Sequence, residues 1–380
     1  MRGRILFNGN IRADRDYVYA ARDLLLDSRH QDPRIADSRK VLLITAAWGE
    51  REHDEGHIKK ALTEIGIPSR FVAGFDRNIE NLSAFHAYRE FCRLEPRLAA
   101  DWAERESLIE SGRDLYLEKN NFYTGQLRRT IAELKERNPG RSLARVMADV
   151  TGTLRHSPAR FDGSRLLSTF LEEDIRDTID RLVANDDRMV RLLSELDEQF
   201  VDGTGLHYNP TWLRLRGDLA DRILSANSLF LFGGNLAELH RCLNFFRLRE
   251  PLMEALRLGT TFLSVSAGSL LLCERIIIYN DFESSREFQL FDRGFGLVRH
   301  LQLFPHCMDR IQTDDPNNLS YLAHRFQNRT CVGLNQDSFL LMEGDPELVC
   351  TSIGSRDGVY VFDPSGAKRC YLQGERLLTN

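Results

Sequence analysis

The sequence lacks any long hydrophobic run. No stretch approaches the roughly 18 uninterrupted apolar residues of a membrane-spanning helix. Near the N-terminus the apolar run Ile5–Phe7 is also too short for a signal-peptide core. The seven cysteines are scattered and form no CxxC pair, which is typical of free thiols in a reducing compartment. We therefore expect a cytoplasmic protein.

An excess of positive charge is also missing. The formal net charge is -5, which argues against a nucleic-acid binder that acts through bulk charge. With 42% hydrophobic and 28% charged residues, the 380-residue chain can bury a large core. The sequence contains no internal repeat, low-complexity tract or flexible linker. These absences favour a globular protein with neither a nucleic-acid nor a membrane partner.

The hydrophobic pattern predicts an α/β core in two parts. The run 40–48 indicates a strand buried on both faces, residues 50–66 a helix ending at Gly66, and 67–75 the next strand. The pattern resumes with a strand at 228–235, a helix pair or one helix kinked near Pro251, and a strand running into a tight turn at 260–268. Later strands are expected within 296–306, 331–342 and 358–363. We predict a three-layer fold with a mostly parallel sheet flanked by helices.

A helical insertion separates the two parts, because the apolar period between about Ser83 and Phe200 is 3.6 residues. The predicted segments are 1–80, the first part of the core; 81–205, the insertion; and 206–380, the second part with the catalytic elements. Within the insertion, 121–160 has eight basic residues against three acidic, and 161–200 five against eleven. Facing halves, or pairing across a homodimer, are favoured over a nucleic-acid patch.

Ser266 lies in Ser-Ala-Gly at the end of an apolar strand. A serine attacks when a strained strand-to-helix turn presents it beside a base and oxyanion donors; the alternative is a serine that caps a helix. Gly234 ends another strand in Leu-Phe-Gly-Gly-Asn, and its N–H and that of Ala267 could meet the same oxygen. His306 follows a third apolar run, where a base would be useful, although a lone histidine there is more often structural.

The order of these pieces resembles the serine peptidase family of alpha-aspartyl dipeptidase and cyanophycinase. The matching motifs are Gly-Gly-Asn, Ser-Ala-Gly, Asn-Asp and Pro-His. The resemblance covers about 40–80 and 215–345 and implies a class I glutamine-amidotransferase-like fold. It also implies Ser266 as nucleophile, His306 as base, Asp281 as the acid that orients the histidine, and Gly234 and Ala267 as oxyanion donors. No cofactor or metal is implied.

Substrate-binding candidates are Asn235, Asp309, Arg310 and Arg325. An arginine fork matches a carboxylate, and a surface ion pair is the alternative for these charged residues. Glu283 and Asp292 compete with Asp281 for the acidic position.

The sequence departs from the family pattern at Ser264, where the family usually has glycine, and at Cys307, commonly aromatic. Cys273 is expected to be buried and unreactive, which argues against a glutaminase. His53 and His57 could hold a metal at i, i+4 spacing, but a solvated helix is favoured.

We therefore predict a serine hydrolase that cleaves small peptides or amides, at aspartyl or β-aspartyl bonds if the relatives are a guide. In one alternative the insertion binds a partner or forms an oligomer, and the core is a low-activity scaffold. An exposed apolar stripe at 175–200 would favour it. Another alternative keeps the triad, changes the substrate to an ester or conjugate, and makes the insertion a lid.

Overall fold

The computed structural model describes residues 2–11, 13–68, 78–149, 163–279, 288–343, 347–352 and 358–377. Its largest element is an eight-stranded sheet in the order β14-β11-β10-β1-β5-β4-β2-β3. The five strands from β1 to β3 pair in parallel, and the other three extend the sheet antiparallel at one edge. The strands are β1 (Arg4–Asn8), β2 (Val41–Ile44), β3 (Ile79–Asn81), β4 (Ser228–Leu231), β5 (Thr261–Val265), β10 (Ser338–Glu343), β11 (Glu347–Ser352) and β14 (Arg376–Leu377).

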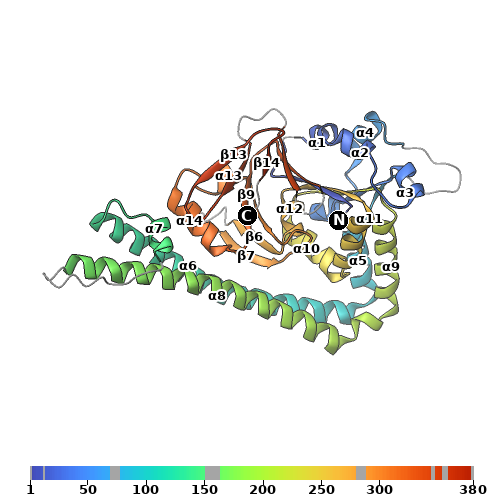
Figure 1. The fold of residues 1–380 in the computed structure, drawn as a ribbon. Coiled ribbons are helices and arrows are strands. Elements are labelled where there is room, and N and C mark those ends of the chain that lie inside the picture. Colours follow the sequence, from blue (N-terminus) through green and yellow to red (C-terminus); the bar gives the residue numbers. More distant parts are fainter. Residues whose placement is uncertain are drawn as a thin grey trace.

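Helices cover both faces of this sheet (Figure 1). The two sets of helices enclose separate hydrophobic clusters. One face carries α1 (Asp14–Ala20), α2 (Arg22–Leu26) and α4 (Gly56–Glu64). The other carries α5 (Ala84–Leu94), α9 (Pro210–Leu224), α10 (Leu236–Phe245), α11 (Arg249–Leu258) and α12 (Ala267–Leu272). The short helices α3 (Pro33–Ser38) and η1 (Ala46–Arg51) lie before and after β2. Strands β2, β4 and β5 are buried throughout, as expected for central parallel strands. The predicted α/β class is confirmed.

Two smaller sheets complete the second part of the core. One has the order β13-β12-β9-β8, and the other is the hairpin β6-β7. Their strands are β6 (Arg275–Tyr279), β7 (Phe288–Arg293), β8 (Leu301–Pro305), β9 (Thr330–Leu334), β12 (Val359–Phe362) and β13 (Lys368–Tyr371). Helix α13 (Cys307–Arg310) follows β8, and α14 (Pro316–Arg325) precedes β9. Parallel pairing of β8 with β9 sets residues 306–310 at the end of a buried strand.

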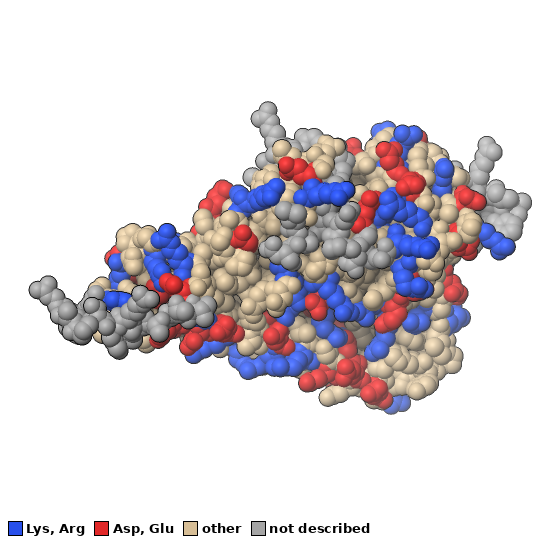
Figure 2. Space-filling view, viewed as in Figure 1, with Lys and Arg blue, Asp and Glu red and all other residues tan. Residues whose placement is uncertain are grey.

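A long helical hairpin runs beneath this body (Figure 1). It consists of α6 (Pro96–Arg137) and α8 (Gly163–Thr204), with α7 (Leu143–Ala148) between them and η2 (Leu206–Tyr208) after α8. Both long helices lie within the predicted insertion, whose boundaries stay a prediction. Figure 2 shows acidic and basic side chains interspersed along the hairpin, and Arg141 bonds Glu172 across it.

The apolar stripe of α8 faces inward. Its buried members are Ile175, Ile179, Leu182, Met189, Leu193 and Phe200, and Leu196 is partly buried. They pack against α6 and, at Phe200, against the main core. The stripe is therefore structural, and it does not provide the exposed surface that would favour a partner-binding role.

Arg325 of α14 joins the core to the hairpin. Its side chain is 1% exposed and forms an ion pair with Asp186 of α8, at 2.7 and 2.8 Å. It also donates to the hydroxyls of Tyr321 and Tyr116 and to Asn120 Oδ1, at 2.7, 2.9 and 2.8 Å. Burial lowers the pKa of Arg325, but the Asp186 carboxylate outweighs this and the pKa is raised well above its ordinary value. The guanidinium stays charged in this buried network.

Three local features add to the predicted order of elements. The stretch after Ser266 is helical only over the six residues of α12, and β6 begins at Arg275. Strand β1, central in the sheet, was not predicted. The segment 236–259 forms the helix pair, which was one of the two alternatives, and Pro251 lies in the first turn of α11, where proline is tolerated. Most of the strand expected at 67–75 lies outside the described residues. In the part of the chain that the structure describes, no helix is long and apolar enough to cross a membrane.

Candidate active site

Ser266 lies on a sharp turn between β5 and α12. Its φ of 47° and ψ of -105° are rare for a residue with a side chain and store strain. Gly268 allows the turn to approach β4, because a Cβ there would lie 2.3 Å from the carbonyl oxygen of Leu231. At Gly233 a Cβ would lie 3.2 Å from that of Ser266. These close approaches hold the serine in a nucleophile-elbow geometry.

Ser264 takes the position where the family usually has glycine, and the structure accommodates its hydroxyl. The side chain is fully buried, and its Oγ lies 2.9 Å from Ser269 Oγ and 3.3 Å from the carbonyl oxygen of Leu6. Ser269 in turn donates to the carbonyl oxygen of Asn8 at 3.0 Å, and the Ser266 N–H donates to the same oxygen. The extra polar group is therefore satisfied by hydrogen bonds beneath the elbow.

His306 meets Ser266 at hydrogen-bond distance, with 3.1 Å between its Nε2 and the Ser266 Oγ. It follows directly after β8 and has a φ of 55°, so a second left-handed residue lies at this site. When Nε2 carries the lone pair, the serine hydroxyl donates to it. The distance is the one required for a base that removes a proton from a nucleophile.

Cys307 fixes the backbone beside this histidine. Its buried Sγ bonds Asn335 Oδ1 at 2.8 Å and presses against Gly333, where a Cβ would lie 2.9 Å from the sulfur. The Cys307 thiol is therefore accommodated in the buried space beside Gly333 and Asn335. Cys273, the other thiol near the elbow in sequence, is fully buried, and burial raises its pKa to about 12. As predicted from the sequence, it is buried, and at that pKa it is a poor nucleophile.

Ser266 and His306 open into a cavity of about 530 Å³. Glycines 233 and 234 line it, and Gly234 has a φ of 136° and would place a Cβ only 2.9 Å from the carbonyl oxygen of Ala47. The Gly233 carbonyl accepts from Trp48 Nε1 at 3.0 Å. Ala267, buried, opens helix α12 next to the serine. The structure therefore brings both predicted oxyanion residues close to Ser266.

Sequence reasoning missed most of the charged residues of this cavity. The lining includes Arg310, as predicted, and also Asp14, Arg51, Asp54 and His57. His57 Nε2 lies 2.9 Å from Asp14 Oδ2, and both residues line the cavity. The signal available was the Asn-Gly-Asn at the end of β1, whose Asn10 also lines the cavity.

The remaining predicted site residues lie elsewhere or cannot be placed. Asp281 and Glu283 fall outside the described residues, as does the side chain of Asp309. Asn235 caps α10 by accepting from the Glu238 N–H at 3.2 Å. Asp292 lines a different cavity, with its Oδ2 3.7 Å from His240 Nδ1.

Arg325 is neither in the Ser266 cavity nor in a surface ion pair. It is buried between α14 and the hairpin, so both readings of this residue are corrected.

A metal-ligand group in the described residues shares His53 with the predicted pair but does not include His57. Glu52, His53 and His86 bring their ligand atoms within 4.8 Å of one another. The buried Glu52 carboxylate already accepts from the backbone N–H groups of Phe85 and His86 and lies 2.7 Å from His86 Nδ1. Glu52 thus stabilises the first turn of α5, and two imidazoles are left as ligands.

Three comparisons with known proteins bear on this site. Residues 188–348, less than half of the chain, match the model of peptidase family S51, and this match confirms the family resemblance predicted from the motifs. The match supports a serine peptidase. A solved structure described as a peptidase from an acI-B1 Actinobacterium is 16% identical, covers 68% of this chain and 90% of its own, and has a TM-score of 0.33, too low to carry an argument. No curated protein matches this chain.

Proposed function

We propose that this protein is a serine peptidase in which Ser266 attacks a peptide carbonyl and His306 takes the serine proton. The observation that carries the proposal is the 3.1 Å contact between Ser266 Oγ and His306 Nε2 at a strained elbow. Cytoplasmic location and a cofactor-free reaction belong to the same proposal.

The reaction proceeds through an acyl-enzyme. The Ser266 oxygen bonds to the carbonyl carbon, and its proton moves to His306 Nε2. The carbonyl oxygen becomes an oxyanion beside the backbone N–H groups of Gly234 and Ala267. His306 then protonates the leaving amine as the C–N bond breaks, and water, deprotonated by His306, hydrolyses the ester. Asp281 is the proposed acid that orients His306.

A short peptide with charges of both signs suits the cavity. Arg51 and Arg310 can receive carboxylates, and Asp54 can receive an amino group. These groups are consistent with small substrates cleaved at aspartyl or β-aspartyl bonds. The burial of the α8 stripe removes the observation that would have favoured a partner-binding role for the insertion.

Mass-spectrometric cleavage of Asp-X, β-Asp-X, Glu-X and neutral dipeptides tests the proposal, with wild-type protein and Ser266→Ala in parallel. The wild type is expected to cleave an acidic member of the panel, and the variant to lose that activity. Cleavage that persists in a folded Ser266→Ala protein would refute the nucleophile, and a neutral preference would refute the substrate class.

A further inference from the structure

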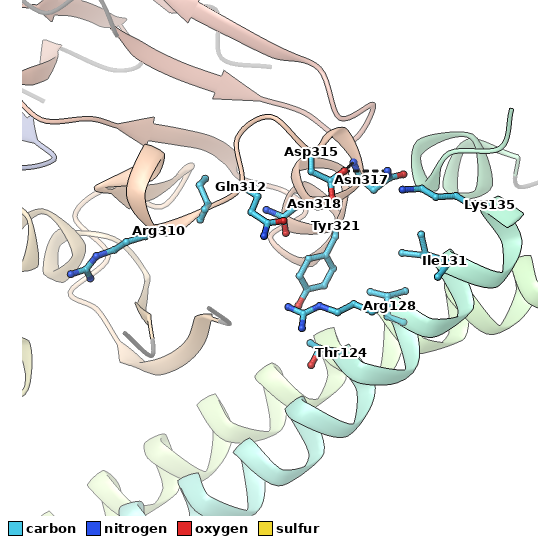
Figure 3. A pocket seen from close by; sticks show the side chains of 13 residues that line it. Thr124, Arg128, Ile131, Lys135, Arg310, Gln312, Asp315, Asn317, Asn318 and Tyr321 are labelled. Atoms are coloured by element: carbon cyan, nitrogen blue, oxygen red, sulfur yellow. Dashed lines mark hydrogen bonds between the residues drawn. The ribbon is translucent and has the colours of Figure 1, made fainter. Parts of the chain in front are cut away.

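A second cavity lies beyond Arg310, between the hairpin and the core. It has a volume of about 290 Å³ and is bordered by α6 on one side and by residues 310–321 on the other. Figure 3 shows Arg128 and Lys135 reaching from α6 toward α14, with Tyr321 opposite Arg128. The family resemblance assigned this cavity no role, because α6 belongs to the insertion.

The lining combines an apolar floor with a positive rim. Leu127 and Ile311 are buried in the floor, and Arg128 and Lys135 are exposed at the rim. Asp315 is the one carboxylate among the described lining residues, and its Oδ1 already accepts from the N–H and the Nδ2 of Asn317, at 2.9 and 3.2 Å. The cavity therefore fits a carboxylate attached to an aliphatic group.

Arg310 connects this cavity to the cavity of Ser266, because it lines both. Its N–H donates to the carbonyl oxygen of His306, the residue immediately before α13, at 3.0 Å. A general acid must face the leaving nitrogen as well as the serine. The path from Ser266 past His306 and Arg310 to the second cavity therefore lies on the leaving-group side of the scissile bond.

From this geometry, and on the basis of the proposed function, we infer that the second cavity binds the carboxyl-terminal end of an extended peptide substrate. The apolar floor receives an aliphatic side chain, and Arg128 and Lys135 bind the terminal carboxylate. The insertion thus binds peptides longer than two residues more tightly than dipeptides, and the active serine removes their carboxyl-terminal portion.

Calorimetric titration of the Ser266→Ala protein tests the inference without requiring hydrolysis. The ligands are Asp-Leu and its longer homologues up to Asp-Ala-Ala-Ala-Leu, each as a free acid and as a carboxyl-terminal amide. The longest free acid is expected to bind about tenfold more tightly than its amide, the size of one charge-assisted contact. Adding Arg128→Gln and Lys135→Gln together should bring that ratio close to one. Lys119→Gln, an exposed lysine of α6 outside the cavity, is the matched control and should retain the ratio.

Equal affinity for acid and amide would overturn the inference, as would a ratio that survives the double substitution or falls with Lys119→Gln. These outcomes can be distinguished from a failure of the proposed function. Hydrolysis without an acid preference rejects the second cavity alone, and an acid preference in a protein that cleaves nothing rejects the peptidase alone.

Discussion

Arg310 and Arg325 flank the same short stretch of chain, yet the structure gives them opposite surroundings. Arg310 lines an open cavity beside His306, where its guanidinium can meet a ligand. Arg325 is buried in an ion pair with Asp186 and hydrogen bonds to three further side chains. The difference shows that the same residue type can have two roles. Arg310, which lines a cavity, can bind a charged ligand, whereas Arg325, whose guanidinium nitrogens are hydrogen-bonded, connects the core to the hairpin.

The backbone follows the same division. Ser266 and His306 hold left-handed φ values where the site requires them, whereas the hairpin joint is built on regular helices. Backbone strain lies at the active site, whereas the buried Arg325 guanidinium between the core and the hairpin is hydrogen-bonded. Substitutions at the active site should therefore change activity, and substitutions around Arg325 should change stability.

His306→Ala should give the largest effect. Loss of the base is expected to lower kcat/KM by at least about 10³-fold, with the free energy of unfolding changed by less than about 1 kcal/mol. Peptide-cleavage kinetics and urea denaturation of the same preparation measure both quantities. Activity of the variant within tenfold of wild type would refute the assignment of His306 as the base.

Arg325→Met should act in the opposite sense, because it leaves the Asp186 carboxylate buried without its partner. We expect the free energy of unfolding to fall by about 3–5 kcal/mol. Adding Asp186→Leu removes the stranded charge and should recover part of the loss. Urea denaturation followed by circular dichroism tests both variants. A loss in the free energy of unfolding below about 1 kcal/mol for the single variant would contradict the stabilising role of the Arg325–Asp186 pair.

Arg310→Met sharpens the comparison, because the same chemical change is made in the cavity. The substrate KM is expected to rise about tenfold, equivalent to about 1.4 kcal/mol, with stability within about 0.5 kcal/mol of wild type. Steady-state kinetics on an acidic peptide measure the first, and denaturation the second. A stability loss like that of Arg325→Met would show that the two arginines do not differ in role.

Ser266→Gly should give the smallest effect. Glycine adopts the elbow conformation without the side-chain penalty, so this variant is expected to be about 1 kcal/mol more stable than Ser266→Ala. Both variants lack the hydroxyl, and only the glycine lacks the Cβ. Equal stability of the two by urea denaturation would mean that the elbow stores no measurable strain.

The sequence was sufficient to predict that Ser266, Gly234 and His306 lie at one cavity, but not most of the charged residues that line it. Each of the three residues follows a buried strand; β4 and β5 are neighbours in the large sheet, where carboxyl ends of parallel strands gather, and β8 belongs to the four-stranded sheet. The family order of motifs added the pairing of serine with histidine. The small residues Ser266, Ala267 and Gly268 were sufficient to predict the tight turn.

Other features depend on distant contacts that no local pattern carries. Strand β1 pairs with β5 and β10, far along the chain, and its short apolar run between Arg4 and Asn8 gives little signal. Asp14 and Asp54 enter the cavity from loops and helix ends of the first part. Arg325 is buried because it pairs with Asp186 in the insertion, a partner that no local sequence pattern identifies.

Intact-protein and peptide mass spectrometry after treatment with a fluorophosphonate tests the central claim most directly, because it reports the activated serine without a known substrate. We predict a single adduct on Ser266 in the wild type, formed at least about 10³ times more slowly in His306→Ala. A folded wild-type protein that remains unlabelled, or is labelled at another residue, would contradict the account.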